Sequence, residues 1–306
     1  MSAVMPLPPK RRTVLGLGLA TLLARPAQAQ DCGPAPVSFP VADPNADPRR
    51  VFPLQLLQLA LGKAGCRADV DGRHDYTQRR ALSQLRLGQL DVTLVGHRQL
   101  PASDGLVVPV PIRQGLLGLR LLLCLPEQVE TLARLRDADQ LKPLAMGYGV
   151  DWNDRPVFEQ LGYRLVTTPI YASLFPMLRA HRFDYLSRGV NEVWEELDLA
   201  QRRGEQLSVV PGVALSYPLD DYFVVRPDAP ALAEALLRGL QQARRDGSYR
   251  ALFDQHFSEA LRRSQLPLRR LLPVRDYPAD ELVQQAQKQL LARLGVSAVP
   301  VGAVRS

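Results

Sequence analysis

Tyr148, Asp151 and Trp152 stand together in a glycine-flanked segment, AMGYGVDW. An aromatic ring in such a loop offers a flat surface on which a ligand can stack, and a nearby carboxylate accepts a hydrogen bond from a ligand donor. The same tryptophan could instead belong to the local hydrophobic core. The segment is therefore a candidate wall of a binding site for a small polar molecule.

Arg188 is the candidate for electrostatic recognition, because it lies between a short strand pattern and a helix pattern that opens with Asn191 and Glu192. At a helix start, unpaired backbone N–H groups and a guanidinium both favour an anion. We therefore predict that Arg188 contacts a carboxylate or phosphate. Two alternatives stay open: Arg188 is a surface residue paired with Glu192, and Asn191 and Glu192 cap the first helical turn.

Further candidates lie in loops that follow other strand patterns. Tyr171, in TTPIYASLF, could donate or accept a hydrogen bond through its hydroxyl group. Asp220 and Asp221 are adjacent acids that could bind a cation or lock a hinge. A histidine in such a loop could equally be only solvent-exposed. The candidates for the facing wall of the site are His74, Tyr76, Arg79, Gly96, His97 and Arg98.

Well-defined metal-binding and catalytic motifs are absent from the sequence. There is no HExxH, no EF-hand loop, no CxxC, no glycine-rich phosphate loop ending in Lys-Ser or Lys-Thr, and no GxSxG turn. The four histidines show no arrangement with a nucleophile. We therefore expect no metal ion, no cofactor and no catalytic residue.

Residues 1–29 have the organisation of an export signal. Lys10, Arg11 and Arg12 precede an apolar stretch at 14–24, and the cleavage pattern Ala-Gln-Ala follows at 27–29. The stretch is too short to span a bilayer core of about 30 Å, which disfavours the alternative of an N-terminal anchor. We expect cleavage after residue 29 and a periplasmic protein, exported by the Sec or the twin-arginine route.

The net charge of +7 gives little support to nucleic-acid binding. Residues 10, 11, 12 and 25 carry four of the positive charges within the export signal, which leaves +3 on the rest. The other arginines are scattered, and no basic run is interleaved with aromatic residues. We expect a soluble monomer that binds a small-molecule solute.

Three cysteines follow the export signal. Cys124 lies in the apolar run LRLLLCLP and is expected to be buried as a free thiol. Cys32 and Cys66 lie near glycines at the ends of expected elements, and an oxidising compartment permits a disulfide between them. The spacing alone does not prove this pair.

The clearest structural pattern is a helix that runs through a glycine into a buried strand. It is found in LSQLRLGQLDVTLVG at 82–96. A similar helix-to-strand pattern is found in SLFPMLRAHRFDYLSRGVNEVWEEL at 173–197. Two such units, about ninety residues apart, predict two similar α/β lobes rather than one continuous sheet.

The alternation of strand and helix patterns favours parallel pairing and right-handed crossovers. Chain crossings are expected near 112 and 216, with a ligand-binding cleft between the lobes. The expected division is 30–112 plus 217–264 for lobe 1, 113–216 for lobe 2, and 265–306 for a C-terminal helical tail. Strands are expected at 37–41, 67–70, 91–95, 107–112, 116–125, 144–147, 164–167, 183–186, 207–214 and 221–225, and helices at 52–64, 76–87, 129–139, 154–161, 174–181, 191–203, 229–246, 249–261 and 279–294.

The chain resembles the bacterial extracellular solute-binding proteins of family 3, the polar amino-acid receptors of ATP-driven (ABC) importers. The resemblance covers roughly residues 36–262 and rests on SQLRLGQLDVTLVG, YASLFPMLRAHRFDYL, AMGYGVDW and ALAEALLRGLQQARRDGSYRALFDQHF. It implies a two-lobed periplasmic-binding-protein-like fold (type II), in which each lobe is a mostly parallel sheet flanked by helices. It also implies closure around one solute, and an importer permease or a membrane sensor as the partner.

This chain departs from the polar amino-acid binders at both ligand contacts. Where the resemblance implies an arginine that grips the ligand carboxylate, the chain reads GHRQLPASDGL, and His97 or Arg98 would have to substitute. Where it implies an acid about five residues after Asp184, the chain has Ser-Arg-Gly at 187–189. A guanidinium in place of an acid favours a solute with an anionic group.

The sequence therefore predicts a non-enzymatic receptor for a small polar or anionic solute that is amino-acid-like or a carboxylate. The alternative is a periplasmic enzyme on the same architecture, such as a cyclic-carboxylate dehydratase, because a fold does not fix a function. In that case Glu192 or Asp151 would serve as the general acid.

Overall fold

The computed structural model describes residues 1, 32–33, 35–40, 51–73, 76–96, 100–101, 103–152 and 154–296, without the side chains of Arg73 and Gln78. Apart from Met1, the export signal expected at 1–29 lies outside the described residues. So do three of the predicted site residues, His74, His97 and Arg98.

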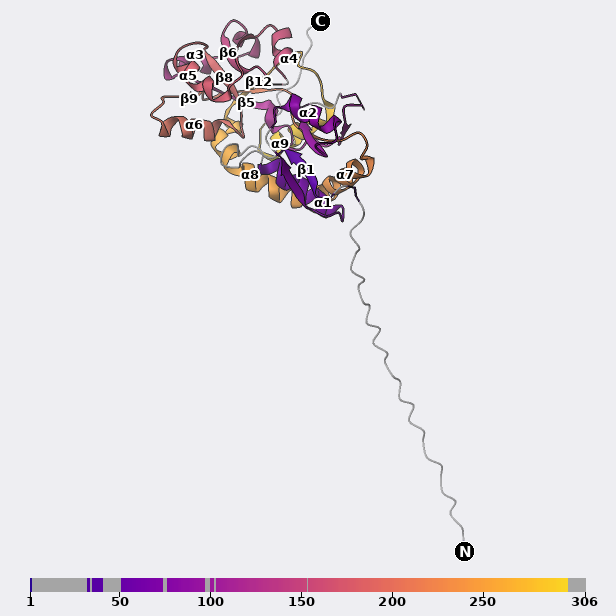
Figure 1. Ribbon diagram of the computed structural model, residues 1–306. Helices are drawn as coiled ribbons and strands as arrows, with labels where there is room; N and C mark the ends of the chain where they lie inside the picture. Colours follow the sequence, from indigo (N-terminus) through magenta and orange to yellow (C-terminus); the bar gives the residue numbers. More distant parts are fainter. Residues whose placement is uncertain are drawn as a thin grey trace, which may run out of the picture.

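Two small sheets build the lower body of Figure 1, which we call the first lobe. One sheet holds the parallel pair β1-β2, and the other has the antiparallel order β3-β11-β4. Their strands are β1 (Val37–Pro40), β2 (Val70–Arg73), β3 (Val92–Val95), β4 (Leu106–Val107) and β11 (Tyr222–Val225). The helices of this lobe are α1 (Val51–Lys63), α2 (Gln78–Arg86), α7 (Pro230–Arg245) and α8 (Ser248–Ser264).

A seven-stranded sheet builds the upper body, which we call the second lobe (Figure 1). Its order is β12-β10-β5-β8-β6-β7, and β9 also pairs with β5. The strands are β5 (Leu119–Cys124), β6 (Ala145–Gly149), β7 (Arg164–Thr168), β8 (Tyr185–Gly189), β9 (Ser208–Val209), β10 (Val213–Ser216) and β12 (Arg270–Pro273). The helices are α3 (Val129–Ala133), α4 (Arg155–Gln160), α5 (Leu174–Arg179) and α6 (Val193–Arg202), and α9 (Glu281–Arg293) follows β12. None of the helices in the described ranges offers an apolar run long enough to cross a bilayer.

The two helix-strand units at 82–96 and 173–197 use the same kind of polar contact to hold their strands. In the first lobe, Asp91 precedes β3, and its Oδ2 accepts hydrogen bonds from the backbone N–H and the hydroxyl of Ser38 in β1, at 2.8 and 2.7 Å. In the second lobe, Asp184 precedes β8 and its Oδ2 accepts from the backbone N–H of Ala145, the first residue of β6, at 2.6 Å. A carboxylate therefore ties two neighbouring strands together in each lobe.

Glycine and proline residues account for two of the differences from the expected elements. The strand expected at 107–112 stops early, because Pro109 and Pro111 have no N–H to donate to a sheet. The strand expected at 207–214 is divided into β9 and β10 by Pro211 and by Gly212, which has a φ of +72°. The strand expected at 67–70 begins three residues later, as β2. The helix expected at 129–139 ends at Ala133, and a 3₁₀ turn (Ala138–Leu141) follows.

The C-terminal tail is not purely helical, which corrects the expectation for 265–306. It contributes β12, which pairs in parallel with β10 of the second lobe, in the register Val213 to Arg270. The guanidinium of Arg270 donates to the carbonyl oxygen of Leu135 at 2.7 Å, so the strand is also held to the loop after α3. The segment 270–273 therefore belongs to the second lobe.

Cys32 and Cys66 form a disulfide, with Cα atoms 5.8 Å apart, and Cys124 is a buried free thiol. The bridge ties the segment before β1 to the end of α1, across a sequence separation of 34. Cross-linking a loop of this size reduces the entropy of the unfolded chain.

Replacing both Cys32 and Cys66 with serine is expected to lower the free energy of unfolding by about 2–4 kcal/mol. Urea unfolding of the oxidised protein and of the double variant measures this difference, and replacing the free Cys124 with alanine provides a variant that keeps the bridge. A loss below about 1 kcal/mol in the double variant would contradict the expectation.

Candidate functional site

Two chain crossings, at 112–118 and 216–221, join the lobes and run side by side. The N–H of Ile112 donates to the carbonyl oxygen of Asp221, and the N–H of Tyr217 donates to that of Gly118, at 3.0 and 3.1 Å. A Cβ atom on Gly118 would lie 1.8 Å from the carbonyl oxygen of Tyr217, so only glycine permits this approach. The crossings form one narrow hinge.

Asp220 and Asp221 lie in this hinge, where they hold backbone and guanidinium groups. Asp220 is fully buried and accepts from the N–H groups of Arg113, Gly115 and Asp221, at 2.6–3.1 Å. Burial raises the pKa of Asp220 to about 7, although the N–H of Gly115 and the charge of Arg113 oppose the rise. Asp221 pairs with the guanidinium of Arg113. Asp221 therefore contacts the hinge in this structure. This contact supports the interpretation that the two acids lock the hinge, rather than the interpretation that Asp221 contacts a ligand.

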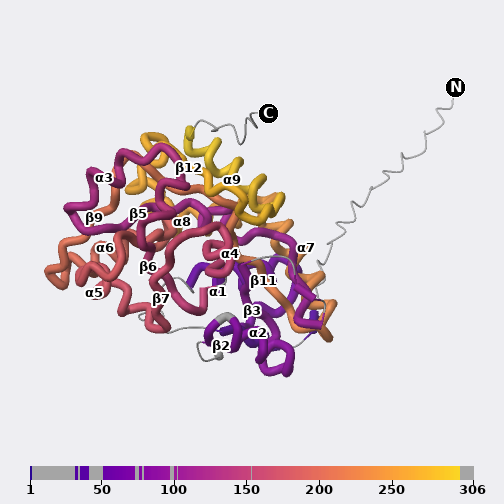
Figure 2. The backbone as a smooth tube through the Cα atoms, turned by 90° about the horizontal axis from the view of Figure 1, so that it is seen from above, coloured from indigo at the N-terminus to yellow at the C-terminus, as the bar shows by residue number. Residues whose placement is uncertain are grey.

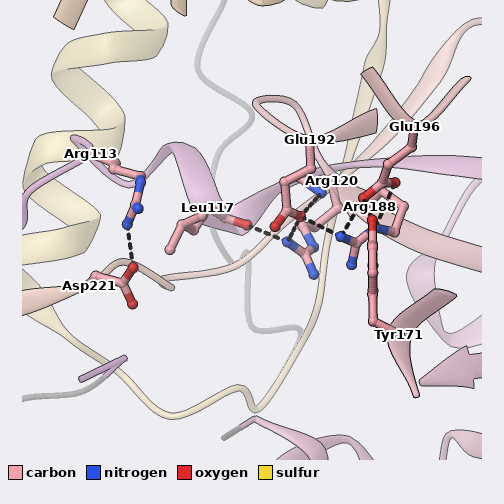
Figure 3. A network of polar contacts seen from close by, with 9 residues as sticks. Arg113, Leu117, Arg120, Tyr171, Arg188, Glu192, Glu196 and Asp221 are labelled. Atoms are coloured by element: carbon pink, nitrogen blue, oxygen red, sulfur yellow. Dashed lines mark hydrogen bonds and ion pairs between the residues drawn. The ribbon is translucent and has the colours of Figure 1, made fainter. Parts of the chain in front are cut away.

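Arg188 lies at the carboxyl end of β8, as the sequence predicts, but its side chain is enclosed. The residue is only 1% exposed. Its Nε and Nη2 atoms donate to both carboxylate oxygens of Glu196 on α6 at 2.6–3.0 Å, and Nη2 also lies 3.2 Å from Glu192 Oε2 (Figure 3). Burial alone would lower the pKa of Arg188, but Glu192 and Glu196 outweigh it and hold the pKa well above its usual value.

The predicted role of Arg188 as a free anion-binding residue is therefore corrected. The alternative pairing with Glu192 is present, although in the interior rather than at the surface. Two carboxylates already neutralise the guanidinium, so it offers no uncompensated positive charge to a ligand.

Two aromatic residues complete the surroundings of this guanidinium. The Cζ atom of Arg188 lies 4.9 Å from the ring centroid of Trp152 and 5.5 Å from that of Tyr171. The hydroxyl of Tyr171 donates to Glu196, as Figure 3 shows. A Cβ atom on Gly149 would meet the indole of Trp152 at 2.5 Å, which explains the glycine before this tryptophan. Trp152 and Tyr171 thus stack on a residue of the chain itself, through cation–π contacts.

Glu192 joins this network to a second arginine on the other face of the sheet. Its Oε2 accepts from the N–H of Gly189 at 3.0 Å and lies 3.4 Å from Nη1 of Arg120. Arg120 and Gly189 are register partners on β5 and β8. Because Gly189 has no side chain, the guanidinium of Arg120 can pass over it to reach Glu192. Glu192 therefore bridges two buried arginines.

Asp154 and Tyr148 lie beside Arg120, and a contact between the Tyr148 hydroxyl and the Asp154 carboxyl affects the pKa of both groups. Beyond this contact, Asp154 Oδ2, Tyr148 Oη and Arg120 Nε have no hydrogen-bond partner among the described residues. Burial raises the pKa of Asp154, and the charge of Arg120 only partly opposes this. Burial, followed by the charge of Asp154, raises the pKa of Tyr148 well above its usual value. Asn191 adds another enclosed acceptor without such a partner, its Oδ1.

The sequence did not single out Arg120 and Asp154 as site residues. The signal for Arg120 is a lone charge inside the otherwise continuous apolar run at 116–125. Buried charges are rare unless they are paired, so this arginine needed a partner. For Asp154 the signal is an acid directly before a helix that opens with Arg155 and Pro156.

The remaining predicted residues lie in different places. Asp151 is exposed in the loop after β6. Tyr76 is half-buried beside α2 in the first lobe, where the guanidinium of Arg80 lies 5.2 Å from its ring centroid. Arg79 is exposed on α2, and Gly96 follows β3. The structure brings together Tyr148, Trp152, Tyr171, Arg188, Asn191 and Glu192, which lie at the carboxyl ends of β6, β7 and β8 or directly after them.

Comparison with known proteins finds likeness in structure alone. No protein-family model and no curated protein matches the chain. An ancestral arginine-binding protein bound to arginine is similar with a TM-score of 0.53 and 14% identity, over 72% of this chain and 96% of that one. A histidine kinase sensor domain with similarity to periplasmic binding proteins has a TM-score of 0.50 and 17% identity, over 72% and 93%.

An ancestral amino-acid-binding protein that is a precursor of cyclohexadienyl dehydratase is also similar, with a TM-score of 0.50 and 15% identity, over 72% of this chain and 93% of that one. These likenesses confirm the expected periplasmic-binding-protein-like α/β fold class. The expectation of a mostly parallel sheet in each lobe is wrong, because β11 pairs antiparallel with β3 and β4, and β5 pairs antiparallel with β8, β9 and β10. The chain has a periplasmic-binding-protein-like α/β fold, and the resemblance to amino-acid-binding proteins that the sequence suggested is found in its structure.

Proposed function

We propose that the chain is an exported solute-binding protein that captures a small polar solute between its two lobes. The observation that carries this proposal is the cluster of buried polar residues at the carboxyl ends of β6 and β8, beside the hinge. In α/β sheets, ligands bind outside the carboxyl ends of parallel strands, especially where two domains meet. Export to the periplasm and delivery to an importer or a membrane sensor belong to the same proposal.

The charges of the cluster favour a solute group that donates hydrogen bonds over an anion. Two arginines, Arg120 and Arg188, face the carboxyl groups of Glu192, Glu196 and Asp154. No positive charge is left over for an anionic solute. Among the enclosed acceptors of the cluster, Asn191 Oδ1 has no hydrogen-bond partner in the described structure, and Asp154 Oδ2 has only the Tyr148 hydroxyl beside it. An ammonium or hydroxyl group of the solute is a suitable partner for both.

A dehydratase on this fold is less well supported by the geometry. Its proposed acid Glu192 is engaged by two guanidinium groups and by the N–H of Gly189. The other proposed acid, Asp151, is exposed to solvent. Mass spectrometry of the protein purified without denaturation would identify a retained solute, and incubation with that solute separates the two classes. A receptor returns the solute unchanged, whereas an enzyme releases a product.

Replacing Asp154 with asparagine is expected to weaken solute binding about tenfold to a hundredfold, because a buried hydrogen bond to a charged group contributes roughly 1.5–3 kcal/mol. The unliganded protein should keep its melting temperature or gain a little, since the variant removes a carboxyl group that burial penalises. Titration calorimetry with the retained solute, alongside a thermal melt, measures both quantities.

The matched control is Asp151→Asn, the same change at an exposed acid three residues earlier in the sequence. It should leave both the affinity and the melting temperature unchanged. Equal affinities in Asp154→Asn and the natural protein would remove Asp154 from the binding site. An equal loss in both variants would show that the effect is not specific to the buried carboxyl.

A further inference from the structure

The C-terminal segment returns twice between the lobes after the two hinge crossings. It leaves α8 in the first lobe, adds β12 to the second-lobe sheet, and then forms α9. In Figure 1, β12 lies in the upper body and α9 in the lower one, and Figure 2 shows the yellow segment that connects them. This segment, residues 260–296, therefore adds contacts to both lobes beyond those of the two hinge crossings.

Helix α9 is anchored on the first lobe at both of its ends. At its start, Asp280 Oδ2 accepts from the hydroxyl of Tyr222 in β11 at 2.7 Å, and Val283 is buried in the hydrophobic cluster that contains Leu85 of α2. At its end, Nη1 of Arg293 donates to Asp254 of α8 at 3.0 Å. The helix is thus fixed in place over the first lobe.

Gln287, in the middle of α9, contacts both hinge crossings with one amide group. Its Nε2 donates to the carbonyl oxygen of Gly115 in the first crossing at 2.8 Å, and to that of Tyr217 in the second at 3.2 Å. Gly115 has a φ of +74°, and a Cβ atom added there would lie 2.6 Å from Cβ of Gln287. The helix therefore rests directly on the hinge, and a glycine is required where they meet.

A second contact joins the start of the segment to the second lobe. The indole Nε1 of Trp194 on α6 donates to the carbonyl oxygen of Ala260 and to Ser264 Oγ, both at 3.0 Å. The guanidinium of Arg263 forms two hydrogen bonds with Asp198, at 2.7 and 2.8 Å, and lies 4.7 Å from the indole ring centroid. The end of α8 is therefore bound to α6 across the boundary between the lobes.

We propose that residues 260–296 act as a strap that restrains movement of the two lobes, with Gln287 as its contact to the hinge. A hinge rotation changes the relative position of the carbonyl groups of Gly115 and Tyr217, so one amide cannot keep both hydrogen bonds during that movement. Opening or closing of the lobes therefore breaks hydrogen bonds of the strap, and these bonds form again when the lobes return to their first position. This proposal concerns lobe mobility and stands whatever solute the cleft binds.

The test replaces Gln287 with methionine, which keeps a similar volume and has no amide donor. The control is Gln285→Met, the same change at an exposed position of α9. Hydrogen exchange at the N–H groups of Gly115 and Tyr217 should accelerate about fivefold to a hundredfold in Gln287→Met, because two hydrogen bonds that restrain the hinge are lost. Exchange at the N–H of Asp184, within the second lobe, should not change in either variant.

Spin labels report the distance between the lobes when they are attached to cysteines introduced at Leu87 and Ile170. These two residues are 67% and 62% exposed and lie in different lobes. We expect a broader distance distribution in Gln287→Met than in Gln285→Met. Equal distributions and equal exchange in these two variants would overturn the proposal. If Gln287→Met does not fold, as judged by its thermal melt, Trp194→Phe tests the strap at its other contact with the same two measurements.

Discussion

Replacing Arg188 with methionine is expected to lower the free energy of unfolding by about 3–5 kcal/mol. The substitution leaves the carboxylates of Glu196 and Glu192 in the interior, where each side chain is only about a tenth exposed and has lost a guanidinium partner. Removing one member of a buried ion pair costs more than the pair itself contributes, because the remaining charge is uncompensated. Urea unfolding of the unliganded protein measures the loss.

The control for this prediction is Arg262→Met, the same change at an arginine of α8 whose side chain is 73% exposed and whose partner Glu259 is 65% exposed. Exposed ion pairs contribute about 0–1 kcal/mol, so this variant should lose little. The double variant Arg188→Met with Glu196→Gln should recover part of the lost stability, because it removes the carboxylate whose guanidinium contacts came from Arg188, while Glu192 keeps its contact with Arg120. If Arg188→Met were as stable as the control, Arg188 would return to the ligand-contact role that the sequence predicts for it.

The location of Arg188 could be predicted from the sequence, whereas its partners could not. The helix-strand pattern places it at the end of a strand, and strand ends define where α/β proteins bind ligands. Its main partner, Glu196, lies eight residues away on a helix whose direction depends on how α6 packs against the sheet. A sequence pattern with a period of 3.6 shows which face of a helix is buried, but not which carboxylate meets which guanidinium.

The two repeated units, by contrast, were visible because their signals are local. Gly88 follows the first helix, His181 with a φ of +52° takes the corresponding place after the second, and an acid precedes each strand. Even so, the function of Asp91 and Asp184 in locking neighbouring strands depends on residues 53 and 39 positions away. Short β12 was missed for the same reason, since four residues ending in Pro273 have a weak pattern and acquire their strand conformation by pairing with β10.

A second large effect is expected at Asp220, whose ionisation should make stability fall as the pH rises from about 4 to about 7. The folded pKa of about 7 lies above the ordinary value of 3.8, because the carboxyl is buried. Between these two values the folded protein keeps a proton that the unfolded chain releases, so folding is favoured most at the acid end of the window and less at the neutral end. Each unit of pKa difference corresponds to about 1.4 kcal/mol, which gives a total effect of a few kcal/mol.

Urea unfolding of the natural protein and of Asp220→Asn at pH 4.5, 5.5, 6.5 and 7.5 measures this contribution as the difference between the two pH profiles. The difference is needed because Asp154, with its raised pKa, acts in the same direction, and His256, whose pKa burial lowers, acts in the opposite one. The groups that face Asp220 are Arg113, Asp221 and Tyr249. Since the negative charge of Asp221 helps to raise the pKa of Asp220, and Asp221 also pairs with Arg113, Asp221→Asn should move the window to lower pH. The prediction would be wrong if the stability of Asp220→Asn fell with pH as steeply as that of the natural protein. In that case the Asp220 carboxyl is already ionised throughout this range, because its hydrogen bonds to backbone N–H groups outweigh the cost of burial.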